Sequence, residues 1–504
     1  MGLPYQCLAS LGQGTLLCAA KGPSIVTFDI ATGPQTLTSW SHPSLKLVDT
    51  CDARIQSEEN GDATAQGNAQ PPSKKRKVEA EAAVGTAPQT ADQSDVPASE
   101  APADGQKPKK QKQKAPPKVD VPFVILLAAT ESGSHIVAVT GQDKTLWVFE
   151  HDGKGALEEL SQRTMPKRPC SMSITSDPQA IICADKFGDV YAVPLIPSST
   201  TSLESGTSLP VAPPKPERAA PKGANSFTVH TERNLKALED QQKHRKRDLP
   251  KEGPTFEHHL LLGHVSMLTA VVSTTLGGRP YIITGDRDEH IRVSRGMPQA
   301  HVIETYCLGH AAFISALCVP RSEPGLLISG GGDNELFLWD WKAGKLLAKT
   351  DVLGLVNQEL DAANQVNRMA VSRLYAYDTA QGCYVIVLCE RIPNAFIFKL
   401  ENSSLTHAQT ISFPRDENPL DIALTPSTAA DGPMRIITTL DSSASLFVRE
   451  FRLDGAHSNG EYFTLHVEEN IELPLEELQR MLYPIENLRK TEREEDVDVG
   501  NAEE

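Results

Sequence analysis

Two histidine–aspartate pairs recur along the chain at a nearly constant spacing. His264 and His310 each follow Leu-Gly and stand 46 positions apart, while Asp288 and Asp333 lie in polar turns 45 positions apart. A histidine beside a carboxylate can serve as a general base or hold a metal ion. Because one repeated structural unit explains both pairs at once, we favour a structural role over catalysis or metal binding.

The segments around these turns predict short β-strands. Tyr281-Ile282-Ile283 precedes the first turn, and Ile291 and Val293 alternate with polar residues after it. This is the period of a half-buried strand. The second copy, residues 326–340, ends in Trp-Asp. A Gly-His pair and a Trp-Asp pair that repeat together at about 45 residues indicate blades of a WD40 propeller.

In such a blade, the histidine bonds the turn aspartate, and a strand hydroxyl and the tryptophan complete a chain of hydrogen bonds. Ser294 stands where the first copy would need its tryptophan, so we expect the chain to be incomplete there. The residues assigned to this structural role are His310, Asp333, Ser329 and Trp339 in one copy, and His264, Asp288 and Thr284 in the other.

The strand pattern occurs seven times. After two long insertions are subtracted, the spacing is nearly even, which predicts a closed ring whose closure protects the sheet edges. The predicted fold is all-β: a seven-bladed WD40 β-propeller with two disordered insertions and a short C-terminal helical tail. The third strands of the seven blades are expected to end near Phe28, Phe149, Val193, Ser294, Trp339, Phe398 and Val448.

Changes in composition mark the boundaries. We place blade one in residues 1–54, blades two and three in 119–196, and blades four to seven in 253–470. Residues 55–118 and 197–252 lack apolar periodicity and are rich in Pro, Ser and Lys, so we predict disordered insertions. Residues 471–504 are expected to form an amphipathic helix, packed on the ring or on a partner, and then an acidic end.

Both insertions carry basic clusters. Lys74, Lys75, Arg76 and Lys77 stand beside prolines, a pattern that favours a nuclear import signal over a solvated charge run. We therefore expect a nuclear protein. Lysines within 107–118, and residues 243–247 at the end of a predicted polar helix, could bind RNA or a partner or simply be solvated.

The bulk composition excludes several classes of protein. The 504 residues carry a formal net charge of −16 and include nine cysteines without a C-x-x-C pair, which indicates buried free thiols in a reducing compartment. The N-terminus lacks a secretory signal pattern, and no apolar run approaches the length of a membrane span. We expect a soluble intracellular protein without membrane contact.

No motif of a known active site occurs. The chain has no G-x-S-x-G, H-E-x-x-H, P-loop or spaced Cys/His zinc set. Gly12-Gln13-Gly14 lacks the third glycine and the following helix of a nucleotide loop, so we interpret it as a hairpin turn. We assign no catalytic residue, metal or cofactor to this chain.

Several segments resemble one family. They are similar to the non-catalytic WD-repeat subunit of the eukaryotic, fungal-type tRNA (guanine-N7-)-methyltransferase, over all seven blades but not the insertions. The resemblance implies a heterodimer in which a separate Rossmann-type subunit binds S-adenosylmethionine and methylates N7 of guanosine 46 in tRNA. This chain would stabilise and orient that subunit. The matching segments are residues 165–170, 184–191, 285–294, 307–310, 329–333 and 487–490.

The resemblance also implies a partner-binding surface. A basic residue at Arg292 matches the family's contact with an acidic residue of the enzyme subunit, and Asp286, Arg287, Glu289 and His290 cluster beside it. These five residues form the predicted partner-binding set. The alternative for Arg292 is an ordinary exposed charge, which would contribute less than ~1 kcal/mol.

Lys167 and Arg168 match another motif of the family. They either face tRNA phosphates, which would give salt-sensitive binding without base readout, or support the blade. Two other functions stay open at this point. A general WD40 adaptor of a nuclear ubiquitin-ligase or chromatin complex would bind peptides at the mouth of the ring, and a propeller enzyme would need a catalytic constellation that the sequence does not show.

Overall fold

Seven four-stranded sheets make up most of the part of the chain that the structure describes. The computed structural model describes residues 3–12, 14–31, 35–45, 122–197, 254, 256–362, 364–379, 382–425, 434–441, 445–451, 461–464 and 473–490. Every sheet in these ranges uses four strands that are consecutive in the sequence and antiparallel to their neighbours. The seven predicted blades are therefore confirmed.

Both insertions fall among the first four blades: residues 55–118 lie between blades one and two, and residues 197–252 lie between the third and fourth strands of blade three. Blade one contains β1 (Tyr5–Ser10), β2 (Leu16–Lys21), β3 (Ser24–Asp29) and β4 (Gln35–Ser41). Blade two contains β5 (Val124–Ala129), β6 (His135–Thr140), β7 (Thr145–His151) and β8 (Leu157–Thr164). Blade three contains β9 (Pro169–Ile174), β10 (Ala180–Asp185), β11 (Asp189–Pro194) and β12 (His259–Gly263). Blade four contains β13 (Leu268–Leu276), β14 (Arg279–Asp286), β15 (Ile291–Arg295) and β16 (Ile303–Cys307).

The last three blades follow the same plan. Blade five contains β17 (Ile314–Cys318), β18 (Leu326–Gly331), β19 (Glu335–Asp340) and β20 (Lys345–Asp351). Blade six contains β21 (Val371–Thr379), β22 (Gly382–Cys389), β23 (Asn394–Glu401) and β24 (Ser404–Ser412). Blade seven contains β25 (Pro419–Thr425), β26 (Met434–Leu440), β27 (Ser445–Phe451) and β28 (Glu461–Thr464).

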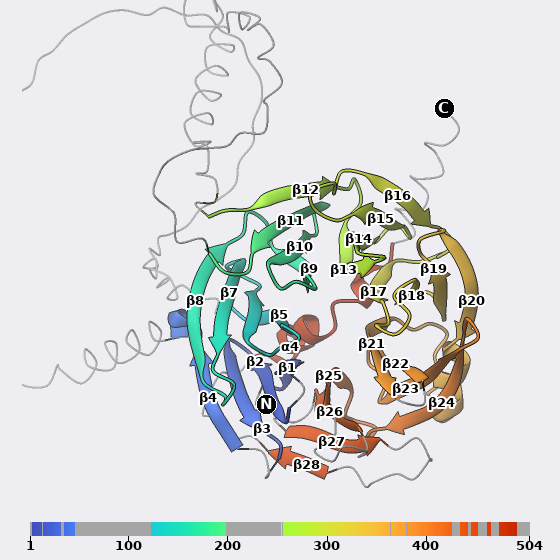
Figure 1. The fold of residues 1–504 in the computed structure, drawn as a ribbon. Helices are drawn as coiled ribbons and strands as arrows, with labels where there is room; N and C mark the ends of the chain where they lie inside the picture. Colours follow the sequence, from blue (N-terminus) through green and yellow to red (C-terminus); the bar gives the residue numbers. More distant parts are fainter. Residues whose placement is uncertain are drawn as a thin grey trace, which may run out of the picture. The chain divides into compact units, whose positions relative to one another are not determined.

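The sheets stand around a central axis, with the first strand of each blade innermost and the fourth at the rim (Figure 1). Burial is greatest between the centre and the rim: every residue of β10 is buried, whereas most of the innermost strand β9 is half-buried and most of the rim strand β8 is exposed or half-buried. Apolar side chains of neighbouring blades pack against each other, as Val137 and Val148 of blade two do with Ile181 of blade three. Each blade thus buries a face that it could not bury alone.

The ring closes where blade one meets blade seven. Leu8, Phe28 and Ile437 belong to one apolar cluster that spans the two blades. The Asp421 carboxylate on β25 accepts a hydrogen bond from the Leu8 N–H at 2.8 Å and another from the Tyr375 hydroxyl of blade six. Within the described residues no strand is shared between the two blades, so packing and these polar contacts close the ring.

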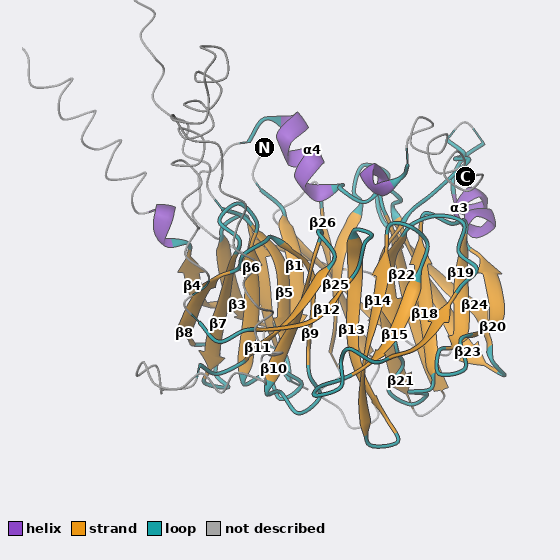
Figure 2. Ribbon diagram, turned by 90° about the horizontal axis from the view of Figure 1, so that it is seen from above, coloured by secondary structure: helices purple, strands orange, loops and turns teal. Residues whose placement is uncertain are grey.

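A C-terminal segment crosses one end of the ring. We call residues 473–490 the strap; it contains helix α4 (Leu475–Leu482) and the 3-10 turn η1 (Glu486–Leu488). Leu478 is buried against Leu3 and Phe123, so the predicted tail helix packs on the ring. Figure 2 shows α4 on the same face as the short helix α3 (Leu353–Glu359).

The strap is fixed by polar contacts along its length. The Glu390 carboxylate, in the turn after β22, accepts the N–H groups of Ile485 and Glu486, both at 2.8 Å. Arg489 donates to the Met369 carbonyl oxygen at 2.6 Å, and the Tyr483 hydroxyl bonds Asp441 of blade seven. The strap therefore contacts residues that border blades one, two, six and seven.

The hydrogen-bonded chain in blade five has the arrangement expected from its sequence. His310 Nδ1 lies 2.7 Å from Asp333 Oδ2, its Nε2 lies 2.7 Å from Ser329 Oγ, and Trp339 Nε1 donates to the same oxygen at 2.8 Å. The structure thus brings all four residues together. Their polar atoms satisfy one another inside the blade, with no free group left for chemistry.

Blade two contains the same chain of hydrogen bonds, although its sequence does not show the pattern that predicts one. His42 Nε2 lies 3.2 Å from Asp143 Oδ2, Thr140 donates to Asp143 Oδ1, and Trp147 Nε1 donates to Thr140 Oγ1 at 3.1 Å. The histidine lacks the preceding glycine and is 101 positions from its aspartate. The first insertion separates them, so periodicity could not connect the pair.

Blade four corrects one assignment. His264 Nε2 lies 3.1 Å from the Thr284 hydroxyl, as expected, but Asp288 does not join them. Its carboxylate faces Lys490 of the strap at 3.3 Å instead. Because Ser294 stands in place of the tryptophan, the third strand of blade four offers no indole N–H to this network of hydrogen bonds. The turn instead places the Asp288 carboxylate beside Lys490 of the strap.

The eight cysteines within the described ranges are all free, and most of them are buried. Burial raises the pKa of Cys183 to about 12, so its thiol stays protonated near neutral pH and behaves as a small apolar side chain.

We expect Ser329→Ala to lower the free energy of unfolding by about 2 kcal/mol, because both His310 and Trp339 would lose a buried partner. Thr284→Val is the matched control: it removes a buried hydroxyl that serves one histidine and no tryptophan, and should cost about 1 kcal/mol. Chemical denaturation of both variants measures the difference, and equal losses would contradict the four-residue chain.

The blade-two chain predicts an acid-sensitive contribution to stability. Burial by itself would raise the pKa of Asp143, but hydrogen bonds from His42, Thr140 and Thr145 lower it from 3.8 to about 2. A lowered pKa stabilises the fold above the ordinary value and loses that effect as pH falls from about 4 to about 2, up to about 2 kcal/mol. The stability difference between the wild type and Asp143→Asn should shrink over that range; a constant difference from pH 7 to pH 3 would refute this.

Candidate partner-binding surface

The turn between β14 and β15 carries most of the predicted partner-binding set. Asp286 is buried, and its Oδ1 accepts the His290 N–H at 2.9 Å. It therefore shapes the turn from inside and cannot contact a partner directly, which corrects its assignment. Glu289 adopts a left-handed conformation with φ of 74°, while the His290 side chain is exposed.

Arg292 lies beside this turn on β15. Its Nη1 donates to the Gly263 carbonyl oxygen at 3.0 Å and its Nε to Ser294 Oγ at 3.1 Å. Across the sheet it is paired with Tyr306, which is 42% exposed. Two hydrogen bonds hold the guanidinium in place at the surface, and a group held in this way loses little entropy on meeting a carboxylate.

Exposed apolar side chains extend the surface onto blade three. Phe187 and Leu308 are each 60% exposed and Val265 is fully exposed. The segments of Phe187 and Val265 are in direct contact, because the His264 N–H donates to the Gly188 carbonyl oxygen at 2.8 Å. We call Phe187, Val265, His290, Arg292, Tyr306 and Leu308 the blade 3–4 surface.

Gly188 permits the close contact between the turn that carries Phe187 and the segment that carries His264 and Val265. It adopts φ of +100°, and a Cβ atom there would lie 2.2 Å from the His264 carbonyl oxygen. Only glycine permits both the left-handed backbone and so close an approach. The turn that presents Phe187 is thereby set against the loop that presents Val265.

The two predicted RNA-contacting residues border the same surface. Lys167 and Arg168 are exposed in the loop between β8 and β9. The Lys167 ammonium lies 4.3 Å from the centre of the Phe187 ring, a cation–π distance. The structure thus places this basic pair beside the apolar part of the surface and away from the blade interior.

The strap reaches the other side of the turn. Arg287 Nε donates to the Leu488 carbonyl oxygen at 2.8 Å, and the Lys490 ammonium lies 3.9 Å from Glu289. Two members of the predicted set, Arg287 and Glu289, are therefore engaged with the chain's own C-terminal segment. Arg287 and Glu289 thus fix the turn against the strap, whereas the side chains of His290 and Arg292 form no hydrogen bond or ion pair with the described strap residues and lie at the surface.

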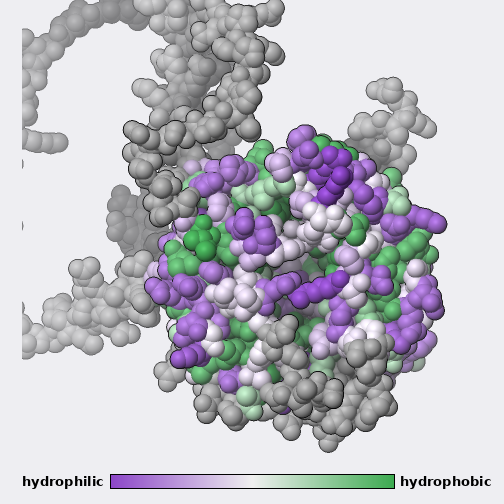
Figure 3. All heavy atoms as spheres, viewed as in Figure 1, coloured by the Kyte–Doolittle hydropathy of each residue, from purple (hydrophilic) through white to green (hydrophobic). Residues whose placement is uncertain are grey.

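This surface is not evident from hydropathy alone. On the face drawn in Figure 3, hydrophilic and hydrophobic side chains are interspersed around the ring.

Within the described residues, no three His, Cys, Asp or Glu side chains gather as a metal site would require, and none of the helices has the length and apolar character of a membrane span. Lys74, Lys75, Arg76 and Lys77 lie outside the described residues, as do the two insertions.

Seven four-stranded blades, two of which contain a complete His–Asp–hydroxyl–Trp chain, define the class of protein: a WD40 β-propeller. The family described as the tRNA methyltransferase TRM82 WD40 domain matches residues 17–458. The chain belongs to this family, which confirms the resemblance seen in the motifs.

Curated relatives carry one common name, tRNA (guanine-N(7)-)-methyltransferase non-catalytic subunit. The protein of Sclerotinia sclerotiorum is 42% identical over 442 residues, covering 82% of this chain and 80% of its own length. Those of Aspergillus clavatus and Aspergillus oryzae are 35% and 34% identical, and each alignment covers 98% of this chain.

Gly188→Ala should disrupt the blade 3–4 surface. The added methyl group must displace the His264 carbonyl group and also disfavours the positive φ, so we expect a loss of stability of more than about 1 kcal/mol. Gly153→Ala is the control, because Gly153 has φ of +76° but nothing within 4 Å of the added atom. Thermal unfolding of both variants tests this, and equal shifts would contradict the close approach.

Proposed function

We propose that this chain is the non-catalytic subunit of a heterodimeric tRNA (guanine-N7-)-methyltransferase. It stabilises and orients a separate catalytic subunit that binds S-adenosylmethionine and methylates N7 of guanosine 46. The observation that carries the proposal is the blade 3–4 surface, which combines exposed apolar side chains with a pre-positioned guanidinium, in a family whose curated members bear this name.

The composition of the surface suits a protein partner. Phe187, Val265 and Leu308 would be desolvated on docking, and Tyr306 beside Arg292 supplies the residue types that dominate binding energy at interfaces. Arg292 would pair with a carboxylate of the catalytic subunit and fix its orientation. Lys167 and Arg168, at the border, would meet tRNA held by the enzyme.

Localisation in the nucleus is part of the proposal. It rests on the basic cluster from Lys74 to Lys77 beside two prolines, which an import receptor can bind as an extended chain.

The function is tested in a strain that lacks this chain. We expect 7-methylguanosine at position 46 to disappear from its tRNA and to return when the chain is restored. Unchanged levels would reject the proposal. Affinity purification from the restored strain should bring down the methyltransferase subunit; ubiquitin-ligase or chromatin components in its place would identify an adaptor.

Arg292→Glu tests the interface. Reversing the charge of a paired, partly desolvated group should weaken binding of the catalytic subunit at least about tenfold, while the ring stays folded despite the loss of two surface hydrogen bonds. Arg279→Glu is the control, because Arg279 is an exposed arginine at the far end of β14 in the same blade. Equal affinities for the two variants would remove Arg292 from the interface.

A further inference from the structure

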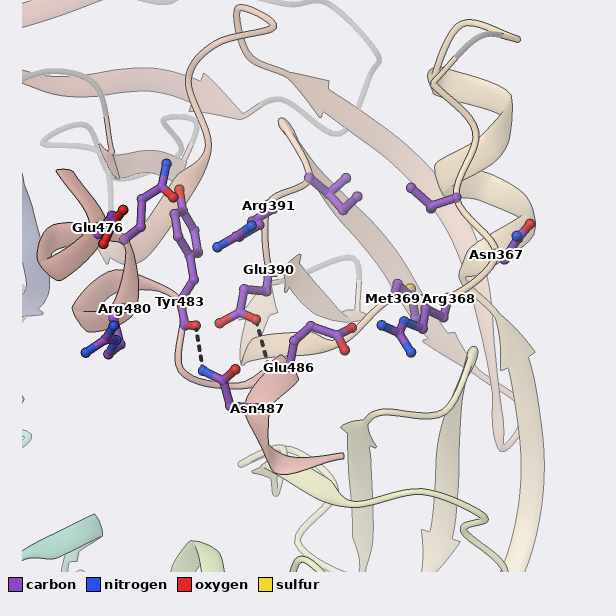
Figure 4. A pocket seen from close by; sticks show the side chains of 13 residues that line it. Asn367, Arg368, Met369, Glu390, Arg391, Glu476, Arg480, Tyr483, Glu486 and Asn487 are labelled. Atoms are coloured by element: carbon purple, nitrogen blue, oxygen red, sulfur yellow. Dashed lines mark hydrogen bonds between the residues drawn. The ribbon is translucent and has the colours of Figure 1, made fainter. Parts of the chain in front are cut away.

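A polar pocket lies between the strap and blade six, away from the blade 3–4 surface. Its volume is about 1180 Å³. Its walls come from three segments: the strap, which includes α4 and η1, the turn after β22, and the loop between α3 and β21. Figure 4 shows the side chains that line it.

Each of the three segments contributes one arginine to the pocket: Arg480 from α4, Arg391 from the turn, and Arg368 from the loop. All three are exposed. Among the described residues, no carboxylate forms an ion pair with any of them, whereas arginines elsewhere on the chain do form such pairs, as Arg321 does with Glu131 at 2.9 Å.

Arg391 is held in an unusual conformation. Its φ is 59°, which is left-handed and uncommon for a residue with a side chain. Its guanidinium lies 4.9 Å from the centre of the ring of Tyr483. A strained backbone and a stacked guanidinium together fix one positive group over the pocket, and strain of this kind is concentrated at functional sites.

The carboxylates in the pocket are largely engaged with the strap. Glu390 accepts two strap N–H groups, and burial raises its pKa. Glu486 pairs with Arg489 at 2.8 Å. Only Glu476, at the start of α4, lines the pocket without a partner among the described residues. The unpaired groups are therefore mainly guanidinium donors, and the amides of Gln479 and Asn487 lie beside them.

We propose that this pocket binds the phosphodiester backbone of tRNA. Guanidinium forks match phosphate oxygens, and Arg, Asn and Gln side chains are the usual donors to RNA backbones. No exposed aromatic ring lines the pocket for base stacking, so the contact carries no sequence information. An acidic peptide is the less favoured ligand, because the lining offers few apolar subsites for its side chains.

This inference rests on the proposed function, since the RNA is the one that the catalytic subunit methylates. Arg391 and Glu390 lie at the same end of the strands as the turn between β14 and β15, which borders the blade 3–4 surface. A tRNA held by an enzyme docked on that surface could therefore extend across the strap to the pocket. The second contact would fix the tRNA relative to the ring.

The test uses the purified heterodimer and a substrate tRNA, with the dissociation constant measured at several salt concentrations. The variant Arg368→Gln/Arg480→Gln removes two guanidinium groups that have no ion pair to lose. We expect its affinity to fall about tenfold and its salt slope to decrease by about 1.5, since each phosphate contact contributes about 0.7 to 0.9. Arg368→Lys/Arg480→Lys should restore the salt slope.

Arg279→Gln/Arg321→Gln is the control, because it removes two exposed arginines from the opposite end of the strands. It should behave as the wild type. A pocket variant with an unaltered salt slope would overturn the proposal, whatever its affinity. Loss of binding to a polyglutamate peptide, with unaltered tRNA parameters, would also overturn it and assign the pocket to an acidic peptide.

The two proposals fail in different ways. A wild-type pair that neither assembles nor methylates tRNA would refute the proposed function. A competent wild-type pair whose pocket variant binds tRNA as tightly, with the same salt slope, would refute the pocket alone.

Discussion

The contact between the first and seventh blades is the interaction on which the rest of the structure depends. Each blade buries its apolar faces only against its two neighbours, so an open array would leave two faces and their strands uncovered. Asp421 joins three blades, because it accepts hydrogen bonds from Leu8 of blade one and Tyr375 of blade six while standing on blade seven. Leu478 of the strap adds an apolar contact over Leu3 and Phe123 on the same side.

Closure matters for function because the candidate surface is shared between two blades. Phe187 comes from blade three and Arg292 from blade four. The turn that carries Phe187 and the side chain of Arg292 both contact the chain at the end of β12, because Gly188 packs against His264 and Arg292 donates to the Gly263 carbonyl oxygen. The strap supports the same region from its other side through Arg287 and Lys490. A rigid scaffold of this kind can present a partner with a surface that no single blade could form.

The sequence predicted what is periodic and missed what is not. The inner strands alternate or run apolar, so seven blades could be counted, but rim strands such as β8 are largely exposed and have no such pattern. His42 was missed because an insertion lies between it and Asp143. Asp288 was assigned to the wrong network because its partner, Lys490, is distant in the chain, and the burial of Asp286 depends on how the turn folds around it.

The central claim is that the ring binds a catalytic subunit through the junction of blades three and four. Hydrogen–deuterium exchange on the ring, with and without that subunit, tests it most directly. We predict that backbone amides in residues 185–190, 264–268, 286–292 and 303–308 gain protection in the complex, while those of blades one, six and seven do not change. Protection confined to other blades, with the junction unaffected, would contradict the account.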